Sequence, residues 1–458
     1  MTGPSDAAIN MPDLQRRAYE LMLQDKAVAA LALVDATFAG RDLDAEMHLL
    51  RGETLMQLPS LDEALAAFRR ARDLDPSNVR AWAHEGAALM RLQRVEEAVA
   101  AFDQGLKLAP RAHGAWYNRG FAYAHLNRTA EAIADFDQAL DLAADSGAAR
   151  VNRAMALLRI GRYREGFAEL EARFSVEPGT RELRQYRQQR WRKGNAIAGK
   201  RILLYAEQGI GDVVQFARFI PQVAAKAAHV TLEVQPAVVR LLKTLPCEVV
   251  AFGAQVAPFN LHSPLVSLGT LLDVQLETIP AQVPYLTAPD DDVARWRSKL
   301  AAHGGALKVG LAWSGNPQHK NDYNRSVRFE QLAPLLNVPG VMFVSLQKDV
   351  RGTDAEALRA ANILDAGKEL GDFADTAALV EALDIVISVD TAVAHVGGAL
   401  GKPIWVLLPF APDWRWMLER SDSPWYPSAR LFRQASLGDW TAPIEAVRRD
   451  LTAAAGTR

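Results

Sequence analysis

A 34-residue period runs through the first part of this 458-residue chain and restricts what that part can fold into. Small residues recur at Gly52, Gly86, Gly120 and Ala154, and a second small set recurs at Ala64, Ala98, Ala132 and Gly166. Bulky apolar residues keep the same step at Phe68, Phe102, Phe136 and Leu170. Such a period is typical of stacked helix pairs, because the small residues let two helices approach and the bulky residue fills the gap to the next pair.

The repeats define the first domain. Four clear copies occupy residues 45–180, and a weaker copy over 11–44 is interpreted as an N-terminal cap with a more polar outer face. We therefore predict an α-helical solenoid over residues 1–180. Such arrays usually hold other polypeptides, so a protein partner is expected. The alternative is that the repeats only solubilise or dimerise the rest of the chain.

Composition argues against several classes of function. The formal net charge is -2, which is unlike a general nucleic-acid binder. Cys247 is the single cysteine, so an intramolecular disulfide is impossible and a reducing compartment is expected. The N-terminal residues lack a secretory pattern, and no apolar run reaches the length of about 18 residues that a membrane span needs. We expect a cytoplasmic protein.

The character of the sequence changes after residue 180. Residues 181–194 are rich in arginine and lysine, and we interpret 181–200 as a solvated basic linker. Contact with an acidic acceptor surface or a membrane is the alternative. From Arg201 onward, short apolar runs alternate with helical stretches. That alternation is typical of parallel sheets with right-handed crossovers.

The apolar runs fall into two blocks. Strand candidates lie at 202–206, 230–234, 248–252 and near Leu265–Leu268, and then at 308–313, 341–347, 362–367, 384–390 and 403–409. A helix over 291–303 separates the blocks. We predict two Rossmann-like lobes, 201–300 and 301–440, facing a cleft, so the fold class is α plus α/β. Ligands of such sheets bind beyond the carboxyl ends of the strands.

The last stretch is expected to be an amphipathic helix over 441–458. Ile444, Val447 and Leu451 share one face at helical spacing.

The first strand is followed directly by a glycine loop. Gly209 and Gly211 permit close approach of the backbone to a ligand, and Asp212 follows at or near a helix start. Capping of that helix is the simpler role for Asp212. The loop lacks the third glycine of a dinucleotide fingerprint, so a nicotinamide or flavin cofactor is not expected.

A long polar loop follows the first strand of the second block. It begins Trp313-Ser314-Gly315-Asn316-Pro317 and continues through His319 to Ser326. Glycine, amide and hydroxyl groups beside Lys320 and Arg325 suit a diphosphate. A polar surface loop is the alternative.

The third motif follows the strand at 384–390. Asp390 and Thr391 are placed to cap a helix that opens at Ala392, and His395 lies four residues after Thr391 on the same face. The free amides and positive end of such a helix receive phosphate oxygens. A structural histidine is the alternative for His395.

These motifs carry resemblances to known families. The 34-residue repeats resemble tetratricopeptide repeats. The third motif, followed by Gly-Lys-Pro and an apolar strand, resembles the nucleotide-sugar site of the lipopolysaccharide heptosyltransferases, and Gly-Ile-Gly-Asp is similar to that family's first loop. Trp-Ser-Gly-Asn-Pro, Asn-Arg-Ser and Ser-Pro-Trp-Tyr-Pro resemble bacterial tetratricopeptide-repeat glycosyltransferases. The architecture also resembles O-linked N-acetylglucosamine transferases and the repeat-bearing transferases of flagellin.

The resemblance implies an inverting, metal-independent glycosyltransferase of the GT-B fold that uses a nucleotide sugar. It makes Asp212 the general base, with loop orientation as an alternative role, and makes Lys320 or Arg325 the group that offsets charge on the leaving diphosphate. Donor binding is assigned to Gln208, Gly209, Gly211, Trp313, Gly315, Asn316, His319, Lys320, Arg325, Ser326, Gln347, Asp390, Thr391, Ala392 and His395. No metal is expected, because the sequence lacks an Asp-x-Asp pair and Asp290–Asp292 is interpreted as helix capping.

Two further expectations concern the surroundings of this site. The first lobe is short, which favours a protein acceptor presented by the repeats over a lipopolysaccharide. The terminal helix is expected to cross back to the first lobe, as in GT-B enzymes. The aromatic segment 412–434 either stacks on base and sugar or packs between the lobes.

Two other functions remain open from the sequence. One is a non-catalytic adaptor whose transferase half is degenerate. The other is a transferase that acts on a glycan or lipid.

Overall fold

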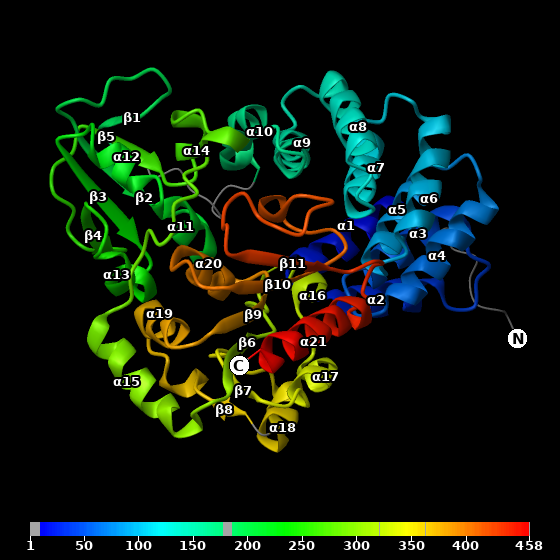
Figure 1. Cartoon of the computed structure of the whole chain (residues 1–458). Coiled ribbons are helices and arrows are strands. Elements are labelled where there is room, and N and C mark those ends of the chain that lie inside the picture. The colour runs from blue at the N-terminus through cyan, green and yellow to red at the C-terminus, as the bar shows by residue number, and fades with distance from the viewer. Residues whose placement is uncertain (1–9, 177–185, 320, 362, 458) are drawn as a thin grey trace, which may run out of the picture. The chain divides into compact units, whose positions relative to one another are not determined.

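The computed structural model describes residues 10–176, 186–319, 321–361 and 363–457. Lys320 of the expected diphosphate loop lies outside these residues, as do 181–185 of the expected linker. The chain divides into two compact units, Met1–Arg153 and Ala154–Arg458, and the boundary falls inside helix α9 (Figure 1).

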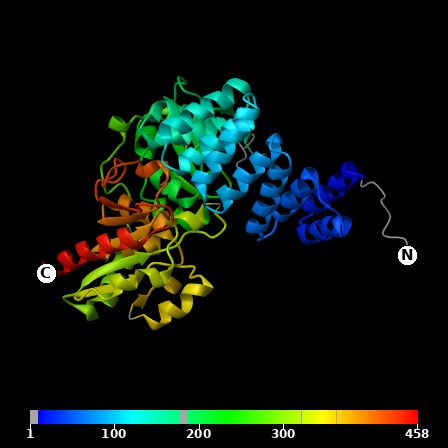
Figure 2. The same ribbon diagram turned by 90° about the vertical axis from the view of Figure 1, so that its right-hand side faces the viewer.

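The first unit consists of helices packed in antiparallel pairs, seen side by side in Figure 2. Its helices are α1 (Met11–Leu23), α2 (Ala27–Phe38), α3 (Ala45–Leu55), α4 (Leu61–Leu74), α5 (Val79–Arg91), α6 (Val95–Leu108), α7 (His113–His125), α8 (Thr129–Leu142) and the start of α9 (Gly147–Arg159). The prediction of a helical solenoid is confirmed for the described residues.

The glycine and the phenylalanine of the repeat meet inside the helix pairs α3–α4, α5–α6 and α7–α8. A Cβ atom built on Gly52 would lie 2.5 Å from Phe68 Cε1, and one built on Gly86 would lie 2.4 Å from Phe102 Cε1. The phenylalanine ring therefore fills the space above the glycine of its own pair. Phe68 also stacks on His84 of the next pair, with ring centroids 5.1 Å apart. The period is thus maintained by contacts within and between pairs.

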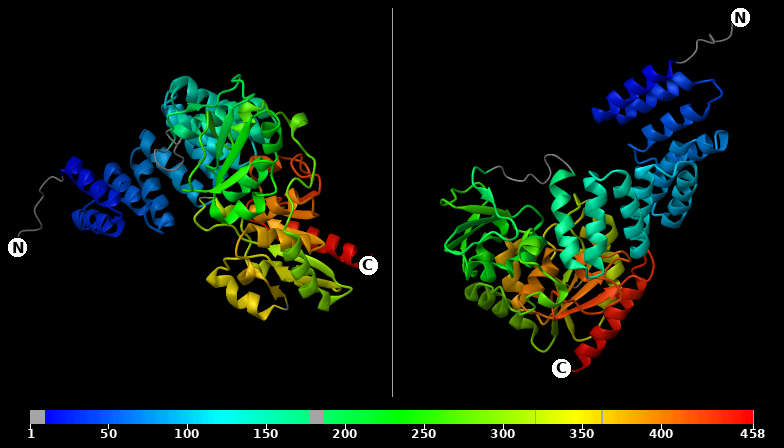
Figure 3. Two further views of the ribbon diagram at one scale, coloured as in Figure 1. Left: turned by 90° about the vertical axis from the view of Figure 1, so that its left-hand side faces the viewer. Right: turned by 90° about the horizontal axis from the view of Figure 1, so that it is seen from above.

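The second unit begins with the end of α9, helix α10 (Tyr163–Leu170) and the short 3-10 helix η1 (Glu171–Ser175). It continues into two parallel sheets, the first green and the second yellow to orange in Figure 3.

The first sheet has the strand order β1-β5-β2-β3-β4, with every neighbouring pair parallel. Its strands are β1 (Gln189–Arg190), β2 (Arg201–Tyr205), β3 (His229–Val234), β4 (Glu248–Ala251) and β5 (Leu261–Pro264). Its helices are α11 (Ile210–Ala217), α12 (Ile220–Ala224), α13 (Pro236–Leu242), α14 (Leu268–Leu271) and the 3-10 turn η2 (Leu276–Thr278).

Two parts of this sheet differ from the sequence prediction. The last strand of this sheet, β5, ends before Leu265 and so precedes the strand candidate near Leu265–Leu268. The hydropathy pattern did not reveal β5 because it contains the buried polar residues His262 and Ser263. β1 lies in the segment expected to be a solvated linker and pairs with β5, and Trp191 beside it is buried. An aromatic anchor and ladder hydrogen bonds therefore hold this segment on the sheet.

The second sheet has the order β11-β10-β9-β6-β7-β8 and is also parallel. Its strands are β6 (Leu307–Ala312), β7 (Val341–Ser345), β8 (Leu364–Asp365), β9 (Ile385–Val389), β10 (Ile404–Leu408) and β11 (Ala429–Arg433). Helix α15 (Asp290–Leu300) and η3 (Ala301–His303) precede it. Its other helices are α16 (Asp322–Arg325), η4 (Phe329–Leu332), α17 (Ala333–Leu336), α18 (Gly352–Ala360), η5 (Gly367–Glu369), α19 (Phe373–Glu381), α20 (Ala392–Ala399), η6 (Trp414–Trp416) and α21 (Thr441–Gly456).

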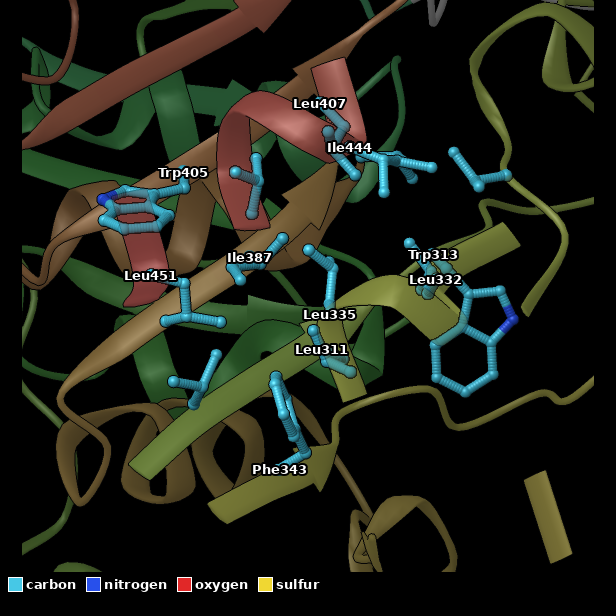
Figure 4. Packing of buried hydrophobic residues seen from close by; sticks show 14 of the residues in the cluster. Leu311, Trp313, Leu332, Leu335, Phe343, Ile387, Trp405, Leu407, Ile444 and Leu451 are labelled. Atoms are coloured by element: carbon cyan, nitrogen blue, oxygen red, sulfur yellow. The ribbon is translucent and has the colours of Figure 1, made fainter. Parts of the chain in front are cut away.

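The terminal helix α21 packs on the second sheet, and the expectation that it crosses back to the first lobe is wrong. Ile444, Val447 and Leu451 are buried, as their spacing predicted. They join a core cluster whose members all come from residue 307 onward. Figure 4 shows Ile444 and Leu451 among the side chains of β9 and β10. Strand β11, which was not predicted from the sequence, extends the second sheet, and the apolar face of α21 packs on β10 and β11.

No helix among the described residues has both the length and the apolar character required to cross a bilayer.

Candidate functional site

A cavity of about 930 Å³ in the second unit is lined by loops from both sheets. Each sheet has a point at which the strand order reverses direction. In the first sheet, β3 and β5 lie on opposite sides of β2, and in the second sheet the order runs outward from β6 on one side and from β9 on the other. Loops that follow parallel strands at such a switch point diverge, which leaves room for a ligand. The three sequence motifs follow β2, β6 and β9, and residues of all three line this one cavity.

Most of the predicted site residues share this cavity. Those in its lining are Gln208, Gly209, Gly211, Asp212, Gly315, Asn316, His319, Arg325, Gln347, Asp390, Thr391, Ala392 and His395. Trp313 and Ser326 are not in the lining.

The glycine loop leads from β2 into α11. Gly209 is the N-cap of that helix in an extended conformation, and Asp212 lies in its first turn. Gly211 is required by packing, because a Cβ atom there would lie 2.7 Å from His395 Cδ2 of α20. The first helix after β2 and the helix after β9 therefore touch at the cavity wall.

Arg415 is the functional candidate that sequence reasoning missed. It comes from η6, lines the cavity, and its guanidinium donates to Oδ1 of Asp212. It also donates to Gln215 Oε1 and, at 2.7 Å, to Asp413 Oδ1. Although burial lowers its pKa, the carboxylates of Asp212, Asp413 and Asp390 raise the pKa of Arg415 above the ordinary value. An arginine so placed keeps its charge and orients Asp212.

The loop after β6 is held in shape by its own side chains. The backbone N–H of Gly315 donates to Ser326 Oγ at 3.1 Å. A Cβ atom on Gly315 would lie 2.5 Å from both Arg325 Nη2 and Asp322 Oδ1, so only glycine fits there. Arg325 donates to the backbone oxygen of Asp390 at 2.9 Å and thereby ties this loop to the one after β9.

Three of the predicted donor-binding residues support these loops. The indole of Trp313 is fully buried and donates to Asp354 Oδ2 at 2.9 Å. Ser326 accepts from Gly315 behind the cavity wall. Gln347 borders the cavity, but its amide oxygen accepts from the backbone of Trp313 and Ser314 at 3.2 and 3.1 Å, and its nitrogen donates to Ser314 O at 3.1 Å. These side chains fix the loop conformation.

The loop after β9 ends at Thr391, the N-cap of α20, which makes no capping hydrogen bond with its side chain. Thr391 Oγ1 lies 3.3 Å from Ser388 Oγ instead. The first amides of α20 at Ala392 and Val393 border the cavity, and the first amides of a helix lack intrahelical acceptors. This end is suited to negatively charged oxygens.

His395 is held as a neutral imidazole. Burial, with Arg415, Arg218 and Arg325, lowers its pKa well below the ordinary value. Its Nδ1 lies 2.7 Å from the Tyr426 hydroxyl, and its ring stacks on Trp416 at 5.6 Å. At neutral pH the ring therefore provides hydrogen-bonding and packing surface but no positive charge.

Asp390 lies beside this histidine, with Oδ1 3.9 Å from His395 Nε2. Burial, together with the Asp413 carboxylate, raises the pKa of Asp390 to about 6. The site thus combines the carboxylates of Asp212, Asp390 and Asp413 with two arginines, Arg325 and Arg415.

The aromatic side chains of residues 412–434 pack as a core, which is the simpler of the two expectations. Trp414, Trp416, Trp425 and Tyr426 are all buried. Trp425 donates from Nε1 to the Tyr163 hydroxyl of α10 at 3.1 Å. These rings support Arg415 from behind, since its guanidinium lies 4.5 Å from the Trp414 ring centroid.

Within the described part of the chain, no three His, Cys, Asp or Glu side chains gather as a metal-binding group.

Comparisons with known proteins identify the N-terminal part. Residues 18–79 and 86–156 match tetratricopeptide repeat models, so this part carries tetratricopeptide repeats, as the period predicted. Protein FlbA of Caulobacter vibrioides is 30% identical over 280 residues. The match covers 55% of this chain and 46% of FlbA, so this chain spans about half the length of that relative.

Solved structures also resemble parts of the chain. A MamA RS-1 double mutant is 20% identical with a TM-score of 0.33, over 37% of this chain and 98% of its own. The tetratricopeptide repeat protein TTC0263 of Thermus thermophilus is 22% identical with a TM-score of 0.33, over 37% of this chain and 92% of its own.

Proposed function

We propose that this chain is a glycosyltransferase of the GT-B fold that moves a sugar from a nucleotide donor to a protein bound through the repeats. One observation carries the proposal. Three loops that resemble transferase motifs, at 207–212, 313–326 and 390–395, are far apart in sequence and yet border one cavity at the switch points of two parallel sheets. Tetratricopeptide repeats in the same chain favour a protein acceptor.

In the proposed reaction an acceptor hydroxyl oxygen attacks the anomeric carbon of the donor sugar. The bond from that carbon to the diphosphate oxygen breaks, its electron pair leaves with the diphosphate, and the sugar configuration inverts. The hydroxyl proton passes to Asp212. Arg415 occupies Oδ1 of that carboxylate, which leaves Oδ2 to accept the proton.

The departing diphosphate requires positive charge that is already in place. The amide end of α20 supplies partial charge at Ala392 and Val393. Arg325 supplies a full charge beside it, held by Asp390 O and by Asp322. Lys320, in the same loop, remains a candidate for this role from the sequence.

A thermal-shift titration of the full chain with UDP, GDP, ADP, CDP and dTDP, and with their sugars, tests the proposal. A ligand of the folded state raises the melting temperature with the logarithm of its saturation. We expect one nucleotide family to do so, and Gly315→Ala to abolish the shift by displacing Arg325. Gly304→Ala, where a Cβ atom meets only ordinary contact, is the matched control. No shift with any ligand would instead favour the adaptor function.

The acceptor is tested next with the donor so identified. A mass increase of one sugar on a protein that binds the repeats supports protein glycosylation. Transfer to a lipid or glycan, unaffected by loss of repeat binding, would move the acceptor to those classes.

A further inference from the structure

Arg173 is a buried charge with well-defined partners. It lies in η1, directly after the last repeat helix α10, and its side chain is 1% exposed. The guanidinium donates to Glu207 Oε1 at 2.8 Å and to Ser267 Oγ at 2.9 Å. It also donates to Glu171 Oε1 at 2.8 Å. A charge this deeply buried is retained only where partners compensate its lost hydration.

Glu207 connects this arginine to the cavity. It begins the loop that carries Gly209, Gly211 and Asp212, borders the cavity, and is 3% exposed. Its second oxygen accepts from the backbone N–H of Leu265 at 3.0 Å, so it joins the ends of β2 and β5. Burial raises the pKa of Glu207, and Arg173 opposes that change. Loss of Arg173 would leave an uncompensated carboxyl group at the base of the loop.

Helix α10 also packs on the helix that carries Asp212. The Phe167 ring meets Phe216 of α11 edge to face, with centroids 6.0 Å apart. A Cβ atom on Gly269 of α14 would lie 2.5 Å from Phe167 Cδ1, and Thr270 donates to the Phe167 carbonyl at 2.7 Å. The last repeat helix is therefore seated against α11 and α14 within the second unit.

We propose that Arg173 is a positioning residue, which holds Glu207 and thereby fixes the loop from Gly209 to Asp212. The inference rests on the proposed function for the role of Asp212, but the positioning itself is a property of the fold. Its consequence is that the last repeat helix α10, together with η1, forms part of the support of the site, so a variant that lacks these residues would lose the order of the loop.

Hydrogen exchange on the full chain tests this positioning without an activity assay. In Arg173→Met we expect amides of residues 207–213 to exchange about tenfold or more faster, because the buried pair that closes the loop is gone. Amides of β9 and β10, in the second sheet, should keep the rate of the unsubstituted protein. Arg164→Met is the matched control, since Arg164 of the preceding helix α10 pairs with Asp273 at the surface.

A second variant covers the case in which Arg173→Met fails to fold. Glu207→Gln keeps the shape of the side chain and weakens the pair from the other side, so it should accelerate exchange over the same residues. Unchanged exchange at 207–213 in the folded variants overturns the proposal. Equal acceleration throughout the second unit also overturns it, because that result indicates general destabilisation.

Nucleotide titration separates this proposal from the proposed function. Arg173→Met should retain the melting shift with the nucleoside diphosphate that the unsubstituted protein binds, because the α20 amides and Arg325 are untouched. Its kcat should fall by about tenfold or more, and its donor KM should rise by a smaller factor, because only Gln208, Gly209 and Gly211 of the assigned donor-binding residues lie in the loosened loop. If no nucleotide binds the unsubstituted protein, the transferase proposal fails, and the exchange result alone decides the positioning.

Discussion

Gly211 of α11 lies directly against the imidazole ring of His395 of α20, so close that a Cβ atom on Gly211 would sit 2.7 Å from His395 Cδ2. Helix α11 follows strand β2 of the first sheet, and helix α20 follows strand β9 of the second. The glycine of the first motif is thus needed to accommodate the histidine of the third, and the two residues in contact form part of the cavity wall.

Gly211→Ala should displace His395 and break its contact with Tyr426. We expect a loss of about 1–3 kcal/mol in the free energy of unfolding, the usual cost of an overpacked core. Urea denaturation of both proteins measures this change. Gly352→Ala is the control, because nothing lies within 4 Å of a Cβ atom there, and its stability should stay near that of the parent. If Gly211→Ala had the stability and the nucleotide affinity of the parent, the His395 ring would be able to move aside without measurable cost.

Asp212→Asn should abolish transfer and leave donor binding largely intact. The amide cannot take the acceptor proton, and a missing general base costs about 10²–10⁴ in rate. Turnover and nucleotide titration of the same preparation measure the two effects. Asp273→Asn, which alters only surface ion pairs, should behave as the parent. Turnover of Asp212→Asn close to that of the parent would leave Asp212 as a residue that only orients the loop.

Much of this fold follows from patterns in the sequence. The 34-residue period predicted the helix pairs because three successive pairs repeat the same contact between a glycine and a phenylalanine. The strands β2, β6, β9 and β10 were predicted because both faces of each are covered, which leaves a largely apolar run. β5 and β11 were missed for the opposite reason, since His262 and Ser263 are buried in one and Arg430 and Arg433 interrupt the other.

The site was predictable to the level of its loops. Strand ends on the same side of a parallel sheet lie at one edge, so the motifs after β6 and β9 could be assigned to one place. The motif after β2 belongs to the other sheet, and it was assigned to the same site because the two lobes were expected to face one cleft. Which side chains face the cavity depends on loop conformation, and Trp313 and Gln347 turned inward to hold the backbone. Arg415 contacts Asp212 across 203 residues, and no local pattern marks such a partner.

His395→Ala should weaken donor binding by about tenfold, which corresponds to about 1.4 kcal/mol. The substitution removes the ring that packs on Gly211 and Trp416, so the end of α20 loses support. Calorimetric titration with the nucleotide identified above measures the affinity. Tyr426→Phe, which removes only the hydroxyl near Nδ1, should have a smaller effect. Donor affinity equal to that of the parent in His395→Ala would make this histidine structural.

EDTA in excess should leave transfer unchanged. The charges proposed for the leaving diphosphate are Arg325 and the amide end of α20, and neither depends on a metal ion. Turnover of protein dialysed against EDTA, with and without added Mg²⁺ or Mn²⁺, is the measurement. Loss of turnover that a divalent ion restores would refute metal-independent transfer.

Asp390→Asn should stabilise the protein at neutral pH while weakening its proposed function. Burial and the Asp413 carboxylate raise the pKa of Asp390 to about 6 from 3.8. Between these values the folded state binds more protons than the unfolded state, so this group favours folding below pH 3.8 and that contribution is lost as the pH rises through about 6. The difference corresponds to about 3 kcal/mol at neutral pH.

Melting temperatures of Asp390→Asn and its parent, compared from pH 4 to pH 7.5, measure this contribution. The curves should lie close together near pH 4, where Asp390 is neutral in the folded protein, and separate as the pH rises, with the variant higher at pH 7.5. Carboxylates that do not interact with Asp390 change both curves equally, so the difference reports on Asp390 together with Asp413, whose charge raises its pKa. A constant difference across this range would show that Asp390 ionises without cost. In that case the unfavourable charge that we assign to the site must lie elsewhere among its carboxylates.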